Sequence, residues 1–214
     1  MSQTLTMLAA AAPLAAGWSL HSLRLRRQVE KARHDPLSGL LTRKPFEERA
    51  KRTLVGGPRA VVVIDLNGFK QVNDVYGHAA GDAVIEATGQ RLKRWSLDHG
   101  GIAARLGGDE FAAVVSVYSL ADLRWAMDGL GEALREPMEF EDHYLSVGFS
   151  AGVIWHQSHS SVPDLSQLMR CADEVMYGVK QTGGGWMAAS SATPAYRTVN
   201  GRRDGRRGTS GEAA

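Results

Sequence analysis

The residue types best suited to chemistry lie in one short run, Arg105 to Phe111, in which two glycines precede two acids. Apolar stretches flank the run on both sides, which predicts a β-hairpin whose tip, Gly107 and Gly108, needs positive φ angles. A tip without Cβ atoms lets a ligand lie against the backbone, and the adjoining carboxylates of Asp109 and Glu110 can hold a divalent cation. An ordinary glycine-rich turn with two solvated acids is the alternative for this run taken alone.

A further acid follows an unbroken run of β-branched residues at positions 61–64. Such a run predicts a strand that is buried on both faces. Asp65 comes directly after it, and a carboxylate at the end of a buried strand is where α/β folds place metal and phosphate chemistry. Gly68, Phe69 and Lys70 then predict a turn into a helix, whose free N–H groups and lysine charge suit a phosphate.

Polar side chains further along the same segment could read the edge of a purine base. Asn73, His78 and Asp82 lie close together in one predicted helical region. A carboxylate accepts from a ring N–H and an exocyclic amine, while an amide both donates and accepts. Helix capping would explain any one of these acids or amides. It does not explain all of them together with Gly77 and Gly81.

Six blocks of the chain, in order and at suitable spacing, resemble the GGDEF-domain diguanylate cyclases from about residue 35 to about residue 185. These blocks are Asp35–Leu40, Asp65–Asp74, Gly77–Asp82, Gly107–Phe111, Ser150–Val153, and Ala172–Tyr177 with Lys180. The resemblance implies a palm-like nucleotidyl cyclase fold over residues 35–186. It also implies bacterial second-messenger synthesis, in which two GTP molecules form cyclic di-GMP and pyrophosphate. One GTP would bind to each of two facing domains in a homodimer.

The resemblance also implies roles for individual residues. Two Mg²⁺ ions per active site, or Mn²⁺ in their place, would be held by Asp65, Asp109 and the carbonyl of Leu66. Either Asp109 or Glu110 would take the proton of the attacking 3′-hydroxyl. The implied substrate-binding residues are Gly68, Phe69, Lys70 and Lys180 for the phosphates, Asn73 and Asp82 for guanine, and His78 near the same nucleotide.

Three departures from the family pattern stand out. Asn67 occupies a position where the family has a second aspartate, which removes one negative charge beside the site. Gly183–Gly185 stands where many members read Gly-Arg-Asn, so an arginine that could contact phosphate is missing. The usual product-binding motif, R-x-x-D, would fall on Asp98–Gly101, where neither the arginine nor the aspartate is present.

Hydrophobic periodicity predicts the elements that must position these residues. Apolar positions at helical spacing predict four helices, over residues 46–53, 82–97, 120–136 and 165–179. The last of them carries a methionine-containing stripe with Cys171, which predicts core packing. Residues 144–155 are typical of a strand. Alternating strands and helices predict an α/β fold, with a sheet of about five strands covered by helices.

Composition agrees with one such domain and short appendages. A chain of 214 residues with 43% hydrophobic content can bury one sizeable core. The formal charge of +2 is too small to indicate a nucleic-acid partner, and a single cysteine excludes a disulfide framework. Residues 187–214 are rich in Ala, Ser, Gly and Arg, which predicts a disordered basic tail.

Residues 1–23 predict a membrane-anchoring apolar helix, because residues 4–23 contain no Asp, Glu, Lys or Arg. Arginines follow at once, so the positive-inside rule predicts a single-pass protein with its catalytic domain in the cytoplasm. Pro13 and Gly17 interrupt the segment, and a cytoplasmic protein with a soluble or interfacial helix is the alternative. Residues 24–34 predict a linker helix that is too short to form a coiled coil alone.

Two other functions are compatible with this sequence. The domain could bind GTP with weak catalysis and regulate a partner by contact, which Asn67 and Gly184 favour slightly. It could also be only a dimerising membrane scaffold, but the preserved guanine-reading pair argues against that. Incubation with GTP and Mg²⁺ separates the three functions by whether cyclic di-GMP forms.

Overall fold

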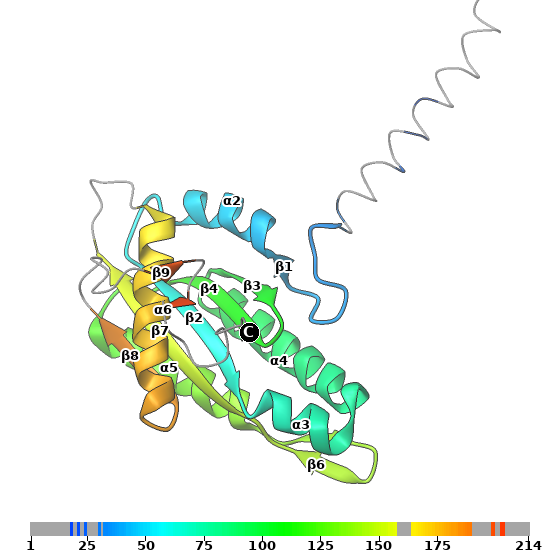
Figure 1. Ribbon diagram of the computed structural model, residues 1–214. Helices are drawn as coiled ribbons and strands as arrows, with labels where there is room; N and C mark the ends of the chain where they lie inside the picture. The colour runs from blue at the N-terminus through cyan, green and yellow to red at the C-terminus, as the bar shows by residue number, and fades with distance from the viewer. Residues whose placement is uncertain are drawn as a thin grey trace, which may run out of the picture.

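The computed structural model of this chain describes residues 18, 21, 24, 30, 32–157, 164–189, 198–199 and 202–203. A six-stranded mixed sheet lies at its centre, with the strand order β1-β3-β4-β2-β7-β8 (Figure 1). The strands are β1 (Leu41–Thr42), β2 (Arg59–Asn67), β3 (Ile102–Gly107), β4 (Glu110–Ser116), β7 (Gly148–His156) and β8 (Gly185–Ala189). The α/β class is confirmed, and the sheet has one strand more than the five that the sequence predicted.

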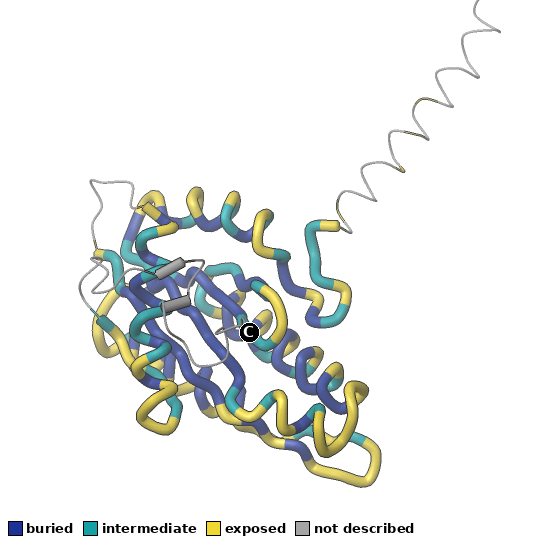
Figure 2. The backbone as a smooth tube through the Cα atoms, viewed as in Figure 1, coloured by how far each residue is buried: buried dark blue, intermediate teal, exposed yellow. Residues whose placement is uncertain are grey.

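Helices cover both faces of this sheet, and the pleat of β2 explains why. Val61 and Val63 face one apolar cluster, while Val62 and Ile64 face another. Both faces of β2 are therefore buried, as Figure 2 shows along the middle of the sheet. One cluster is closed by α2 (Arg43–Thr53) and α6 (Leu165–Gln181), and the other by α4 (His78–Asp98) and α5 (Leu120–Arg135).

The helix α3 (Phe69–Tyr76) joins the end of β2 to α4. Gly77, with a φ angle of 84°, separates α3 from α4, so α4 begins at His78 rather than at the predicted Asp82. The strand predicted over residues 144–155 is two strands, β6 (His143–Leu145) and β7. β6 pairs with β5 (Met138–Phe140) in a hairpin outside the main sheet.

The folded domain extends to Ala189, because β8 pairs with β7 in parallel over residues 185–189. The sequence placed this boundary at residue 186. Two short strands, β9 (Thr198–Val199) and β10 (Arg202–Arg203), pair with each other in the segment that was predicted to be disordered. The rest of that predicted tail lies outside the described residues.

The predicted membrane anchor, residues 1–23, lies outside the described residues except for Trp18 and His21, and the predicted linker is described only in part. Among the residues that the structure describes, no helix combines the length and the apolar character needed to cross a bilayer.

The predicted core stripe of α6 is confirmed. Cys171 and Met176 are buried in the cluster that α6 forms with the sheet. Burial, helped by the nearby charge of Glu174, raises the pKa of the Cys171 thiol, so the side chain packs as a small uncharged group. Asp164 caps the helix by accepting from the backbone N–H of Ser166, which satisfies one of the free donors of the first turn.

Candidate active site

The predicted acids meet at one edge of the sheet, where β2 ends and the β3–β4 hairpin turns. Asp65 is directly opposite Glu110 across the β2–β4 ladder and opposite Ser150 on the other side. The backbone N–H of Leu66 donates to the carbonyl of Asp109 at 3.2 Å, which ties the hairpin tip to the end of β2. Asp65 is buried, with only 5% of its surface exposed, and Asp109 is half-buried.

The hairpin tip has the backbone that the sequence predicted. Gly107 has a φ angle of 147° and Gly108 one of 54°, values that side chains other than glycine rarely adopt. Neither position has an atom within 4 Å of where a Cβ would lie, so the tip is open on this side. A ligand could therefore approach the backbone of the tip closely.

Arg105 clamps this hairpin to the chain segment that precedes the sheet, a role that the sequence analysis missed. Its Nη1 donates to both carboxylate oxygens of Asp35, at 3.1 and 3.3 Å, and its Nε donates to the carbonyl of Gly108 at 2.9 Å. Asp35 also accepts from the N–H and the hydroxyl of Ser38. The sequence did contain a signal for this contact. An acid, Asp35, stands at the start of the domain, and an arginine, Arg105, stands just before the double glycine.

The carboxylates at the site carry more negative charge than the nearby basic side chains neutralise. Burial raises the pKa of Asp109, and the neighbouring carboxylate of Asp65 raises it further, while Lys180 and Arg105 offset this only in part. Lys180 donates a hydrogen bond to Oδ1 of Asp65. The structure therefore places Lys180, which was expected at the phosphates, on a carboxylate expected to hold metal.

The carboxylate of Asp65 raises the pKa of Asp109, and a divalent cation between the two side chains would remove this repulsion. In the part of the chain that the structure describes, no three or more His, Cys, Asp or Glu side chains are grouped as a metal site. The expected ligand set has only two such side chains, Asp65 and Asp109, and takes its third ligand from the backbone of Leu66.

The expected phosphate turn is the start of α3. Gly68 has a φ angle of 75° and stands at the N-cap position without a side-chain cap, so the first N–H groups of the helix have no capping partner. Phe69 is half-buried against the core, and Lys70 is exposed. A free helix N-terminus beside a lysine is a suitable site for an anion.

The two residues expected to read guanine come from neighbouring helices that pack together. Asn73 lies on α3 and Asp82 on α4. A Cβ on Gly81 would lie 2.0 Å from Oδ1 of Asn73, so the amide rests on α4 one residue before Asp82. The structure thus places the side chain of Asn73 against the turn of α4 that contains Asp82. His78 is exposed at the first position of α4.

Two of the departures from the family pattern contact each other. Oδ1 of Asn67 accepts from the hydroxyl of Ser150 at 2.9 Å. A Cβ on Gly184 would lie 2.5 Å from Nδ2 of Asn67 and 2.9 Å from the carbonyl oxygen of Phe149, and Gly184 has a φ angle of 97°. Any side chain at position 184 would therefore collide with Asn67 and with the backbone of Phe149.

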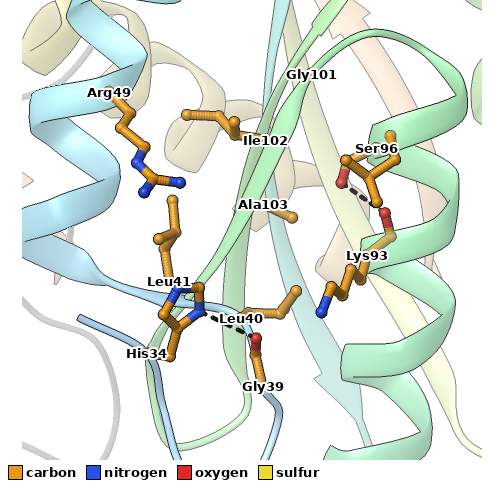
Figure 3. Close-up of a pocket in the computed structure, with 11 residues that line it drawn as sticks. His34, Gly39, Leu40, Leu41, Arg49, Lys93, Ser96, Gly101, Ile102 and Ala103 are labelled. Carbon is orange, nitrogen blue, oxygen red and sulfur yellow. Dashed lines mark hydrogen bonds between the residues drawn. The ribbon is translucent and has the colours of Figure 1, made fainter. Parts of the chain in front are cut away.

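A separate hollow of about 100 Å³ lies near the turn where the product-binding motif was expected (Figure 3). His34, Arg49 and Lys93 are its basic lining residues, and they come from three different segments of the chain. Among the described residues that line this hollow, none carries a carboxylate. It is distinct from the edge of the sheet that carries Asp65 and Asp109.

Comparisons with known proteins agree with this geometry. Residues 32–185 match the family model described as "Diguanylate cyclase, GGDEF domain". An uncharacterised 19.3 kDa protein of Streptomyces ambofaciens is 41% identical over 77% of this chain and 87% of its own length. The diguanylate cyclase DgcP of Pseudomonas aeruginosa is 32% identical over 77% of this chain. The chain spans only 25% of the length of DgcP.

A solved structure shows the same fold. A sensory box/GGDEF family protein from Caulobacter crescentus superposes with a TM-score of 0.63 at 35% identity, and the match covers 71% of this chain and 100% of that one. The signature hairpin, the matched residues and this likeness lead to one conclusion. The chain belongs to the GGDEF-domain diguanylate cyclase family.

Proposed function

We propose that this chain is a diguanylate cyclase, which condenses two GTP molecules into cyclic di-GMP and pyrophosphate. The observation that carries the proposal is the meeting of Asp65, Asp109 and Lys180 beside the free N-terminus of α3. The relatives named as diguanylate cyclases support it. A GGDEF domain that only binds GTP and regulates a partner by contact would not need this cluster of paired charges.

In the proposed reaction, the 3′-oxygen of one GTP forms a bond to the α-phosphorus of the other. The bond from that phosphorus to the bridging oxygen breaks, and pyrophosphate leaves. A divalent metal ion held by Asp65, Asp109 and the carbonyl of Leu66 would supply positive charge where the attacking and leaving oxygens become more negative. The 3′-hydroxyl proton passes to a carboxylate of this chain.

Two carboxylates are placed to accept that proton. Asp109 is half-buried at the hairpin tip, where its carboxylate can accept a proton. Glu110 faces Asp65 directly across the ladder and is the alternative. In either case the accepting group lies at the hairpin tip, whose glycines leave room for the ribose.

Lys180 has two roles in this proposal. Before the nucleotide binds, its ammonium group neutralises Asp65. When GTP enters, Lys180 moves to the phosphates, where the start of α3 and Lys70 also contribute positive charge. The side chain is 36% exposed, which leaves it free to make this exchange.

Asn73 and Asp82 read the guanine in this proposal, and His78 lies at the same end of α4. Asp82 accepts from the ring N–H and the exocyclic amine of guanine, a pattern that adenine does not offer. Each domain holds one GTP, so synthesis requires a homodimer with facing domains. Residues 1–23 anchor the proposed dimer to the membrane, on the evidence of their apolar composition and the arginines that follow.

The test is incubation of the purified full chain with GTP and either Mg²⁺ or Mn²⁺, followed by mass spectrometry of the products. Cyclic di-GMP and pyrophosphate are expected in a ratio of one to two, because each of the two bonds formed releases one pyrophosphate. GTP that binds but stays intact with both metals would contradict the proposal and favour a contact regulator instead.

A further inference from the structure

The turn that follows Lys180 offers no side chain to a ligand. Gly183, Gly184 and Gly185 make up this turn, and β8 starts with Gly185. Gly185 is the register partner of Ser150 on β7, which is itself the partner of Asp65 on β2. The turn therefore lies along the same edge of the sheet as the acids. Any charged group at this point must come from another element.

Among the residues that the structure describes, Arg135, the last residue of α5, brings a charged side chain to this turn. The helix contacts both β7 and β8 (Figure 1). Nη2 of Arg135 lies 3.8 Å from where a Cβ on Gly185 would be. Its guanidinium carbon lies 4.9 Å from the centre of the Phe149 ring, and Nη1 donates to the carbonyl of Gly131 at 3.4 Å.

These contacts hold the guanidinium beside the turn without neutralising it. A guanidinium on an aromatic ring keeps its charge and most of its donors. Arg135 is exposed, and no ion pair joins it to any carboxylate in the described ranges. Glu132 and Glu136 line a shallow surface hollow with Arg135, but neither forms an ion pair with it.

Two other basic groups near the acids already have partners. Arg105 is held by Asp35 and the carbonyl of Gly108, and Lys180 is held by Asp65. Arg135 is therefore a fixed, unpaired cation on the β8 side of the site. A planar guanidinium suits phosphate because it can donate two parallel hydrogen bonds.

We propose that Arg135 binds the β- and γ-phosphates of GTP across the glycine turn. This inference rests on the proposed function, because it takes the α-phosphate to lie at Asp65 and Asp109. β7 separates β2 from β8, so the backbone of Gly185, beside which Arg135 lies, is about 10 Å to the side of Asp65, given the spacing of neighbouring strands. The β- and γ-phosphates, which leave as pyrophosphate, extend away from the attacked α-phosphorus and can therefore reach Arg135.

The decisive variant is Arg135→Gln, studied in the full chain with Mg²⁺ present. Arg124→Gln is the matched control, because Arg124 is also exposed on α5 and lies near the other end of that helix. Calorimetry measures binding of a non-hydrolysable GTP analogue, and competition measures binding of GMP. Thermal unfolding of each variant reports any loss of the packing on Phe149.

Loss of a charge-assisted contact in Arg135→Gln should weaken analogue binding by about tenfold or more, while GMP binding changes by less than about twofold. Arg135→Lys should lie between Gln and the natural residue, and Arg124→Gln should bind as the natural protein does. Equal weakening of analogue and GMP, or no weakening of either, overturns the proposal. If the natural chain itself binds no GTP analogue, the proposed function fails as well.

Discussion

Arg105 and Asp35 form a two-contact ion pair that joins the start of the domain to the signature hairpin. Their side chains are only 16% and 19% exposed, so water screens the pair less than it would on an open surface. Burial alone would raise the pKa of Asp35, but hydrogen bonds from Ser38 and Arg105 outweigh it and lower the pKa. The carbonyl of Gly108, next to Asp109, is held by the same arginine.

This pair predicts a pH-dependent loss of stability in Asp35→Asn. Because the folded-state pKa of Asp35 is below 3.8, its contribution is fully present above pH 3.8 and is lost as the pH falls through the folded value. At neutral pH the variant should lose about 1–3 kcal/mol of unfolding free energy, the cost of removing hydrogen bonds to a charged group. Urea unfolding at pH 7 and in steps below pH 4 measures the difference.

The difference in unfolding free energy between Asp35→Asn and the natural chain should shrink as the pH falls through the folded-state pKa of Asp35. Asp142→Asn, on the exposed turn between β5 and β6, serves as a control with little expected effect. A difference that is constant across this pH range would show that the charge of Asp35 is not what stabilises the hairpin.

Catalysis should depend on Asp109. Replacing it by alanine removes a carboxylate that is expected to hold metal, which should lower kcat by about a thousandfold or more. Asp142→Ala is the matched control, because Asp142 is an exposed acid away from the site. The readout is the initial rate of cyclic di-GMP formation. Near-normal synthesis by Asp109→Ala would refute the assignment of this carboxylate.

Much of this site could be predicted from local sequence. The β-branched run that ends in Asp65 folds as a strand buried on both faces, and the double glycine at 107 and 108 has positive φ angles. Both signals are local, because burial on two faces favours continuous apolar runs and a tight tip favours residues without a Cβ.

Other features depend on contacts between distant segments, which no local pattern encodes. β1 is only two residues long and exists because it pairs with β3. Asn67 and Gly184 are far apart in the chain, yet the amide of one fills the space beside the other. The pairing of Lys180 with Asp65 likewise follows from how α6 lies on the sheet.

The contact between Asn67 and Gly184 predicts a steric cost for Gly184→Ala. The new Cβ would meet Nδ2 of Asn67 at 2.5 Å and the carbonyl of Phe149 at 2.9 Å, on a backbone with a φ angle of 97°. We expect a loss of about 1–3 kcal/mol in unfolding free energy, measured by urea titration.

Gly178→Ala on α6 is the control for this prediction. Nothing lies within 4 Å of its Cβ position, so alanine there should be neutral or slightly stabilising. In an Asn67→Ala background one of the two close contacts at Gly184 is gone, and the cost of Gly184→Ala should fall. An unchanged cost in that background would mean that Asn67 does not restrict the turn.

Base selectivity should depend on Asp82. Removing its carboxylate leaves the guanine N–H and amine without an acceptor, while binding of adenine loses nothing. Asp82→Ala should therefore raise the KM for GTP by about tenfold or more and narrow the preference for GTP over ATP. Glu86→Ala is the control on the same helix, since Glu86 is exposed and accepts a hydrogen bond from Gln90. Unchanged selectivity in Asp82→Ala would mean that guanine is read elsewhere.

Product should not inhibit this enzyme through the usual surface site. That site needs an arginine for phosphate or guanine and an aspartate to accept from a guanine edge. Asp98 puts a negative charge in the place of the arginine. A Cβ on Gly101 would lie 2.2 Å from the carbonyl oxygen of Val114, so no side chain fits where the aspartate is needed. Arg105 is already held by Asp35.

The basic hollow nearby does not replace that site. His34, Arg49 and Lys93 can attract an anion, but the lining residues that the structure describes include no carboxylate to accept from guanine. Calorimetric titration of cyclic di-GMP into protein saturated with a non-hydrolysable GTP analogue should therefore show no submicromolar binding. Submicromolar binding that disappears in Arg49→Gln or Lys93→Gln would refute this prediction, because the hollow would then recognise product without a carboxylate.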